Sequence, residues 1–227
     1  MTWLSALVLA SIALLAAPAI AATPGFEEDF TAGSAGFSTG GVTTVTHVSS
    51  GGVGGAGDPY ISISNTLVGF LGSFSIAPDL VGNLPADGVT GYSFWLRDTG
   101  ANDNLEIHVG VGTAFTNFWL SIPGFTPPDG SWQKFTVDLT NPSQWVQIIG
   151  TGTFQDALAS SDRLLFRHDV PPLVMNPDTV AANFGLDRIQ VLPVPAPIPT
   201  VSAPGRALLA LLFVVLTGLG IHRRHGI

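Results

Sequence analysis

The chain of 227 residues contains no cysteine and few basic side chains. The lack of cysteine excludes disulfides, thiol nucleophiles, covalent haem attachment and cysteine-based zinc sites, so the hydrophobic core must supply the stability. Lys and Arg number eight against sixteen Asp and Glu, which gives a formal net charge of −8. Because phosphate binding needs positive charge, this balance argues against nucleic acid as a partner and favours cations.

Recognisable catalytic motifs are also missing. The three central histidines, His47, His108 and His168, do not occur in an HExxH or similar metal-ligand spacing. There is no Gly-x-Ser-x-Gly motif, which disfavours Ser-His-Asp chemistry. The glycine-rich run 51–57 is not followed by Lys and lies between predicted strands, so it is not a phosphate-binding loop. The sequence therefore favours a protein that is not an enzyme.

One enzymatic alternative stays open at this stage. Asp98, Asp103 and Glu106 lie close together in the sequence, and a pair of carboxylates is what a glycoside hydrolase or lyase requires. Acidic side chains at strand ends are, however, common solvated groups, and the sequence marks none of these three as buried.

The N-terminal residues predict a signal peptide over residues 1–22. An apolar block from Leu4 to Ala17 is followed by Ala19 and Ala21, the small residues that a signal peptidase accepts, so cleavage is expected near Ala21 or Ala22. The segment before the apolar block contains no Lys or Arg, which leaves an uncleaved N-terminal anchor as the alternative.

The C-terminal residues predict a membrane anchor. A proline-rich linker over residues 193–206 leads into an apolar stretch from Ala207 to Ile221, followed by the basic tail 222–227 with Arg223 and Arg224. Fifteen residues would be short for a hydrocarbon core of about 30 Å, and extension back to Val201 gives a longer span. The positive-inside rule places the basic tail in the cytoplasm and the remainder outside.

The start of this tail resembles a bacterial protein-sorting signal. Ile198, Pro199, Thr200, Val201 and Ser202, followed by an apolar segment and an arginine pair, resemble the IPTL-CTERM tails, which share their layout with PEP-CTERM tails. Ala196 stands where the PEP-CTERM motif has Glu, and the residues after Ser202 also depart from the usual pattern. The resemblance implies recognition by an exosortase-like enzyme in the envelope of a Gram-negative bacterium, with a final location at the outer surface or outside the cell.

Residues 23–192 predict one all-β domain, an antiparallel β-sandwich of jelly-roll type with one short helix. Predicted strands are short, rich in β-branched and aromatic residues, and bounded by Gly, Pro, Asn or Asp. They cover 43–48, 60–64, 70–76, 91–97, 105–111, 115–122, 132–139, 163–168 and 184–192. Phe154 to Ser160 predicts the helix, with Thr153 as N-cap and Asp156 at its third position.

Several segments from Gly91 onward are similar to the laminin B (domain IV) pattern. They are Gly91–Leu96, Trp132–Leu139, Phe154–Ala159, Arg163–Arg167 and Phe184–Val191. The resemblance implies a galactose-binding-like jelly roll, a fold that hosts sugar-binding and adhesion modules. In such relatives the first and last strands run together and often hold a structural calcium, which implies Glu27 or Glu28 beside Asp187 as oxygen ligands.

Period-two alternation predicts a ligand-binding face. If strands 91–97, 105–111 and 115–122 pair as a meander, one face carries two tryptophans among polar side chains. The residues are Trp95, Arg97, Glu106, His108, Asn117 and Trp119. Aromatic planes beside hydrogen-bonding groups suit a sugar ring. The sequence thus predicts an exported structural or adhesion module of the extracellular matrix, with carbohydrate binding and carboxylate-based glycosidase activity as alternatives.

Overall fold

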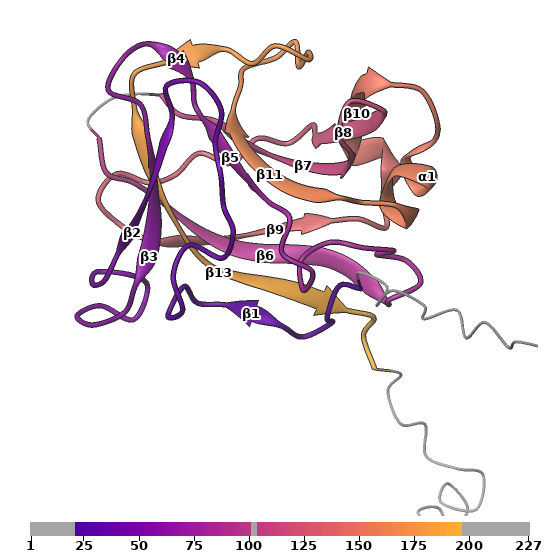
Figure 1. The fold of residues 1–227 in the computed structure, drawn as a ribbon, viewed down its shortest axis with the longest axis horizontal. Coiled ribbons are helices and arrows are strands. Elements are labelled where there is room, and N and C mark those ends of the chain that lie inside the picture. Colours follow the sequence, from indigo (N-terminus) through magenta and orange to yellow (C-terminus); the bar gives the residue numbers. More distant parts are fainter. Residues whose placement is uncertain (1–20, 101–103, 197–227) are drawn as a thin grey trace, which may run out of the picture. The chain divides into compact units, whose positions relative to one another are not determined.

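The computed structural model describes residues 21–100 and 104–196 (Figure 1). The chain divides into two units, Met1–Val194 and Pro195–Ile227, and nearly all of the second lies outside the described residues. The predicted apolar ends, the sorting motif from Ile198 to Ser202 and Asp103 lie outside them as well. Within the described residues, no helix is long and apolar enough to cross a membrane.

The described part of the chain is built almost entirely from strands. They are β1 (Glu27–Glu28), β2 (Thr44–Val48), β3 (Tyr60–Ser64), β4 (Gly69–Phe70), β5 (Gly72–Ser75), β6 (Val89–Asp98), β7 (Ile107–Thr113), β8 (Asn117–Ser121), β9 (Gln133–Asp138), β10 (Trp145–Gly150), β11 (Arg163–His168), β12 (Thr179–Val180) and β13 (Asn183–Pro193). One 3-10 turn, Pro142–Gln144, and one α-helix, α1 (Phe154–Ala159), interrupt them.

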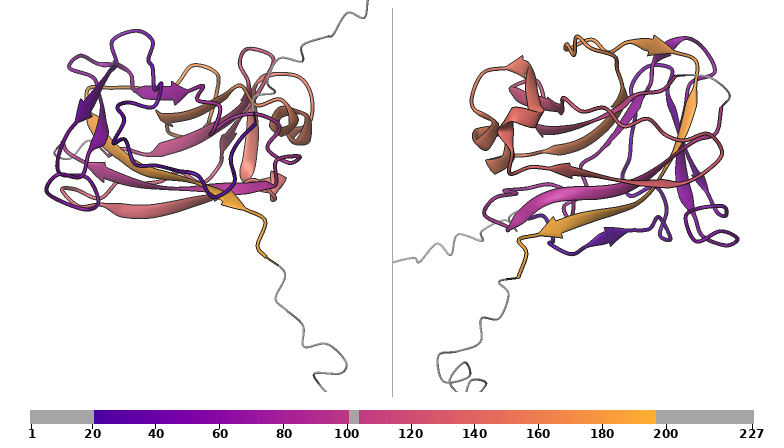
Figure 2. Two further views of the ribbon diagram at one scale, coloured as in Figure 1. Left: turned by 60° about the horizontal axis from the view of Figure 1, so that its bottom comes forward. Right: turned by 180° about the vertical axis from the view of Figure 1, so that it is seen from behind.

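These strands form an antiparallel β-sandwich, which confirms the predicted fold class (Figure 2). A six-stranded sheet has the order β2-β3-β13-β6-β9, with β1 paired to β13 beside this path. A five-stranded sheet has the order β10-β8-β7-β11-β5. A small third sheet joins β4 to β12. All of the strand pairs are antiparallel.

The core lies between the two large sheets, where alternate side chains of each strand meet. Phe94 of β6 packs edge-on against Phe166 of β11, with ring centroids 4.9 Å apart. Tyr92, also on β6, is fully buried, and its hydroxyl donates to the carbonyl oxygen of Leu80 at 2.6 Å. The fully buried phenol of Tyr92 thus has a partner, as a buried polar group requires.

Helix α1 forms as its sequence predicts. Thr153 is the N-cap, and its hydroxyl accepts from the Asp156 amide while the Asp156 carboxylate accepts from the Thr153 amide, which is a capping box. Phe154 and Leu158 are buried against the sandwich, so the short helix closes one end of the core.

The sequence missed three strands and one sheet assignment. β1 and β12 have two residues each, too few for a periodic pattern. β10 was missed because a bulge between Gln147 and Ile149 breaks its alternation. The predicted meander of β6, β7 and β8 is wrong: β6 belongs to the six-stranded sheet, whereas β7 and β8 belong to the other.

Candidate functional site

The outer face of the five-stranded sheet presents an apolar floor. Leu165 of β11 lies between Phe74 of β5 and Gly110 of β7, and Gly110 is opposite Leu120 of β8. A Cβ on Gly110 would lie 2.7 Å from the Phe118 ring, so the glycine lets this ring pack closely against β7. Aromatic and aliphatic side chains therefore share a face that lies outside the core.

Arg163 stands at one end of this floor between two aromatic rings. The carbon at the centre of its guanidinium is 4.6 Å from the Phe74 ring centroid and 5.7 Å from that of Phe115. Its Nε donates to Asp162 Oδ1 at 3.2 Å. The described residues offer its two terminal amino groups no hydrogen-bond partner, and the side chain is 24% exposed. A flat, cationic donor group is thus held by cation–π contacts and available to a ligand.

Phe115 is the most exposed large hydrophobic residue among those described, at 79%. It lies in the turn between β7 and β8, and its backbone has φ of +61°. An L-residue in this left-handed region costs about 1–2 kcal/mol relative to the right-handed one. An exposed aromatic side chain on a strained backbone lowers the stability of the fold. Residues of this kind are concentrated at binding sites.

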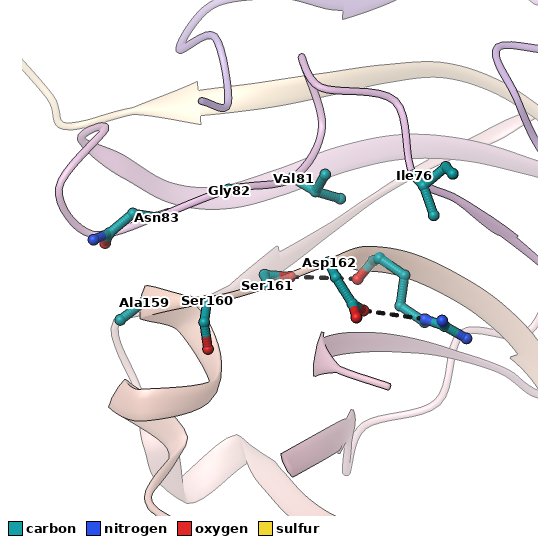
Figure 3. Close-up of a pocket in the computed structure, with 9 residues that line it drawn as sticks. Ile76, Val81, Gly82, Asn83, Ala159, Ser160, Ser161 and Asp162 are labelled. Carbon is teal, nitrogen blue, oxygen red and sulfur yellow. Dashed lines mark hydrogen bonds and ion pairs between the residues drawn. The ribbon is translucent and has the colours of Figure 1, made fainter. Parts of the chain in front are cut away.

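Two hollows meet at Arg163. The larger, of about 530 Å³, lies between the segment before β6 and the end of α1 (Figure 3). Its lining includes Ile76, Val81, Asn83, Ser160 and Asp162. The smaller, of about 100 Å³, lies over the apolar floor. We refer to both hollows together with Phe74 and Phe115 as the Arg163 groove.

The larger hollow is rigidly framed. Gly82 and Ser161 exchange two backbone hydrogen bonds, of 2.9 and 3.0 Å, which tie its opposite sides together. Asp162 Oδ1 is already occupied by the amide of Ala114, at 3.0 Å, and by Arg163. The second carboxylate oxygen of Asp162 has no hydrogen bond within the described residues. The groove therefore combines flat aromatic rings with the guanidinium of Arg163 as a hydrogen-bond donor and the carboxylate of Asp162 as an acceptor. This combination suits a ring that carries hydroxyl groups.

Two of the predicted ligand residues lie on the opposite side of the sandwich. Trp95 and Arg97 belong to β6 and face outward from the six-stranded sheet. The Arg97 guanidinium stacks on Tyr60 and Trp132, with its central carbon 4.9 and 4.7 Å from their ring centroids. Arg97 Nη1 and Trp132 Nε1 both donate to the carbonyl oxygen of Gly51. These side chains hold down the glycine-rich loop 51–57, a structural role.

Trp119 and Asn117 do not join a ligand surface. Trp119 is opposite Val111, on the core side of the five-stranded sheet, and its ring packs against Phe154 at 5.4 Å. Its Nε1 donates to Asn117 Oδ1 at 2.8 Å, and Asn117 Nδ2 donates to the carbonyl oxygen of Thr153. The prediction that these two residues share an exposed face with Trp95 is wrong, because they secure the start of α1 instead.

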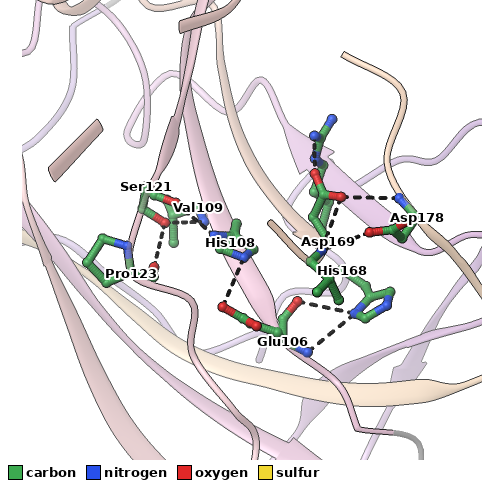
Figure 4. Close-up of polar contacts among 10 residues, drawn as sticks. Glu106, His108, Val109, Ser121, Pro123, His168, Asp169 and Asp178 are labelled. Atoms are coloured by element: carbon green, nitrogen blue, oxygen red, sulfur yellow. Dashed lines mark hydrogen bonds and ion pairs between the residues drawn. The ribbon is translucent and has the colours of Figure 1, made fainter. Parts of the chain in front are cut away.

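Glu106 and His108 do come together, near the start of β7 (Figure 4). His108 is fully buried, and its Nδ1 lies 2.7 Å from the carbonyl oxygen of Ser121. Its Nε2 is 3.4 Å from Glu106 Oε1, within ion-pair distance but without the alignment of a hydrogen bond. His108 belongs to the same sheet as Arg163, but it is fully buried and closed off from a ligand.

A second polar cluster fixes the loop after β11. Arg167 is buried and ion-paired with Asp169, and it also donates to the carbonyl oxygens of Val174 and Met175. His168 beside it has its pKa lowered, chiefly by burial. A neutral imidazole suits this position, since its Nδ1 can accept from the Glu106 amide. These groups are used within the fold.

The candidate carboxylate pair of a glycosidase is not assembled among the described residues. Asp98 is at the end of β6 in the six-stranded sheet, whereas Glu106 precedes β7 in the other sheet and pairs with His108. Asp103 lies outside the described residues. Asp98 accepts from the amide of Gly100 at 2.7 Å, as residues that end strands often do.

The candidate calcium residues lie along β1 and β13, which pair with each other. Asp187 is fully buried, accepts from the amides of Val53 and Arg188, and has its pKa raised, chiefly by burial. Burial also raises the pKa of Glu28, whose charged neighbours are Asp29 and Asp79. Arg188 Nη1 is 4.0 Å from Glu27.

The carboxylates of Glu27, Glu28 and Asp187 each interact with different neighbours and do not converge on one point. Within the described residues, no three His, Asp or Glu side chains are grouped as a metal site requires. Calcium bound by Glu27 or Glu28 with Asp187 therefore stays a prediction.

Comparison with known proteins gives a likeness of fold. No protein-family model matches the chain, and no curated protein matches it. Similar solved structures include the family 11 carbohydrate-binding module of the cellulase Lic26A-Cel5E of Clostridium thermocellum, with 15% identity, a TM-score of 0.49 and coverage of 77% of this chain and 97% of that one. The CBM22-1 xylan-binding domain of Paenibacillus barcinonensis Xyn10C has 13% identity, a TM-score of 0.48 and coverage of 77% and 100%.

Sequence reasoning missed the groove residues Phe74, Phe115 and Arg163. The available signal was Phe115 itself, which follows Ala114 at the boundary of a predicted strand and opens it with an aromatic residue. Its exposure could not be read from the sequence, because strand ends and turns look alike when the turn contains no Gly, Pro, Asn or Asp.

Proposed function

We propose that the β-sandwich is a carbohydrate-binding module that holds a saccharide in the Arg163 groove. The Phe74 and Phe115 rings provide apolar planes for the C–H face of a sugar ring, and the free amino groups of Arg163 donate to its hydroxyl oxygens. Asp162 supplies an acceptor for a hydroxyl proton.

The exposure of Phe115 carries this proposal. Phe115 is a solvated phenyl ring on a strained backbone, beside an arginine with unused donors. Its exposed surface is stabilised only when another molecule covers it. Burial of such a ring against a ligand contributes about 1.5–3 kcal/mol.

A binding role fits the groove better than hydrolysis. Asp162 is the one carboxylate that lines either hollow, whereas glycoside hydrolysis generally uses two. The proposed role of the module is accordingly to bind a saccharide without cleaving its bonds.

Affinity electrophoresis through gels that contain mixed-linked β-1,3-1,4-glucan, xylan or agarose tests the proposal. We expect at least one polymer to retard the full-length protein, and Phe115→Ala to weaken that binding about tenfold, which corresponds to about 1.4 kcal/mol. Phe70→Ala is the matched control, because Phe70 is also an exposed phenyl ring, at 51%, but lines neither hollow of the groove. Equal retardation of both variants would reject the site.

We further propose that the module is exported and processed at its tail, on the evidence of the terminal residues alone. A mature N-terminus near Ala22 and a C-terminus near Thr200 are expected for signal peptidase cleavage and exosortase-like sorting. Mass determination of the protein from cell envelopes checks both ends, and a mass that includes Met1 and Ile227 contradicts the proposal.

A further inference from the structure

One end of the sandwich carries exposed apolar side chains that the saccharide groove does not use. Val42, Leu67, Val68 and Phe70 gather around β4, and Leu67 and Val68 are 67% and 71% exposed. We call these four residues the apolar tip. In Figure 1, β4 is at the top of the view, while β13 runs toward the bottom.

The fold holds this tip in a defined shape. β12 pairs with β4 in the register Thr179–Phe70 and Val180–Gly69. The side chain of Asn65, which is buried, donates to the carbonyl oxygens of Gly69 and Val180 at 2.9 and 3.2 Å. The Thr43 hydroxyl donates to the carbonyl oxygen of Phe70. The exposure of Leu67 and Val68 is therefore built into the fold, since the backbone on both sides of them is fixed.

A hollow lies beside this protrusion. It has a volume of about 180 Å³ and is lined by Gly40, Gly41, Val42, Gly69 and Phe70, with Thr179 at its side. Gly69 allows Val42 to pack closely against β4, since a Cβ on Gly69 would lie 2.4 Å from Val42 Cγ2, and a Cβ on Gly40 or Gly41 would meet nothing within 4 Å. The same surface thus contains a protruding pair, Leu67 and Val68, and a recess walled by apolar groups.

We propose that a second copy of this chain covers the apolar tip, with Leu67 and Val68 of each molecule entering the hollow of the other around a two-fold axis. A surface that carries both a protrusion and a recess is complementary to itself, which is the requirement for an isologous interface. Because both parts belong to one patch, the contact closes as a dimer instead of extending into a fibre.

Charge favours the same occupant. The domain from residue 23 to 192 carries sixteen carboxylates and five basic groups, so two copies repel each other over most of their surfaces. Residues 39–46 and 63–77, which contain the four tip residues, have no charged side chain, and one exposed carboxylate, Asp178, precedes Thr179 at the side of the hollow. This end is where two acidic molecules can approach with the least repulsion.

A lipid surface fits these residues less well. Proteins that lie on membranes combine apolar side chains with Lys or Arg that contact the headgroups. The tip segments contain no basic residue, and Arg167, the nearest along β11, is buried in its ion pair with Asp169. β11 begins at Arg163, in the groove, and ends at His168. The apolar tip and the groove therefore lie toward opposite ends of this strand and can be occupied together.

Disulfide trapping tests this contact, because the chain has no cysteine of its own. Full-length Val68→Cys and Val42→Cys proteins, distinguished by tags of different mass, are mixed in detergent and oxidised. We expect a disulfide-linked heterodimer from this pair, since the protrusion of one copy meets the hollow of the other. A Val68→Cys and Phe115→Cys mixture is the control and should give none, because Phe115 is equally accessible but lies at the groove.

Two further measurements decide the outcome. Leu67→Asp, at a position exposed enough to leave the melting temperature unchanged, should lower the yield of the trapped heterodimer at least tenfold. Equal trapping in the control pair, or no trapping in either pair, overturns the proposal. Co-sedimentation of the wild-type protein with phosphatidylcholine vesicles that Leu67→Asp abolishes, without trapping, would assign the tip to a lipid surface instead.

Discussion

At the scale of single residues, two sets of aromatic side chains differ in what their edges contact. Trp119, Trp132 and Trp145 each donate their indole N–H to an oxygen of the protein, so their amphipathic character serves the fold. Phe74 and Phe115 have no hydrogen-bonding edge, and their rings flank Arg163 on the outside. The sequence favoured Trp95 and Trp119 as ligand residues because it shows which side chains have a polar edge, but not where a partner for that edge lies.

A substitution at Gly185 on β13 tests whether the contacts of Trp132 with Arg97 stabilise the fold. A Cβ at this position would lie 2.8 Å from Trp132 Cη2 and 3.3 Å from Tyr60 Cε2. We expect Gly185→Ala to displace the indole that stacks on Arg97 and to reduce the free energy of unfolding by about 1–3 kcal/mol. Urea denaturation followed by tryptophan fluorescence measures the change.

The matched control is Gly40→Ala, since a Cβ on Gly40 would meet nothing within 4 Å. It should leave the stability of the monomer at or slightly above that of the wild type. If Gly185→Ala is as stable as this control, the contacts of Arg97 and Trp132 with loop 51–57 do not stabilise the fold.

At the scale of elements, alternation located the strands well but not their sheets. The ranges for β3 and β11 agree residue for residue with the sequence prediction, because β3 alternates apolar and polar residues and β11 has a short apolar run between basic residues, each with polar boundaries. Period two tells which residues share a face and does not tell which strand lies alongside. β6 and β7 are consecutive along the chain, yet they lie in different sheets, and this separated Trp95 from His108.

The β7–β8 turn offers a prediction with opposite effects on stability and binding. Phe115→Gly removes the penalty of an L-residue at φ of +61°, so we expect the free energy of unfolding to rise by about 1 kcal/mol. The same change removes the phenyl ring, so saccharide binding should fall about as far as in Phe115→Ala. Thermal denaturation and affinity electrophoresis on one preparation measure both, and a variant that gains stability while it keeps its affinity contradicts the assigned role.

At the scale of the whole molecule, fold class was readable from the sequence and the Arg163 groove was not. Short strands punctuated by Gly and Pro suffice to indicate an antiparallel sandwich. A surface that joins β5, the β7–β8 turn and β11 depends on contacts between residues 74, 115 and 163, which sequence patterns do not encode. The uncharged segments around the apolar tip were visible in the sequence, but their meeting at one end was not.

Calcium is a prediction at this same scale, because it would join the two ends of the domain through β1 and β13. If Glu27 or Glu28 and Asp187 bind Ca²⁺, millimolar calcium should raise the melting temperature of the full-length protein and a chelator should reverse the shift. Asp187→Asn should abolish the response, whereas Asp129→Asn, far from β1 in the sequence, should keep it. Identical melting with calcium and with chelator ends this prediction.

The proposal that the Arg163 groove binds a saccharide is tested most directly by an amide and side-chain NMR titration of the full-length protein with a mixed-linked β-1,3-1,4-glucan tetrasaccharide and with xylohexaose. We predict that at least one of them shifts the Arg163 Nε–H resonance and the amides of residues 113–117, while the indole resonances of Trp95 and Trp132 stay in place. Shifts at those two indoles with an unchanged Arg163 signal would return the binding site to the opposite sheet and contradict the account.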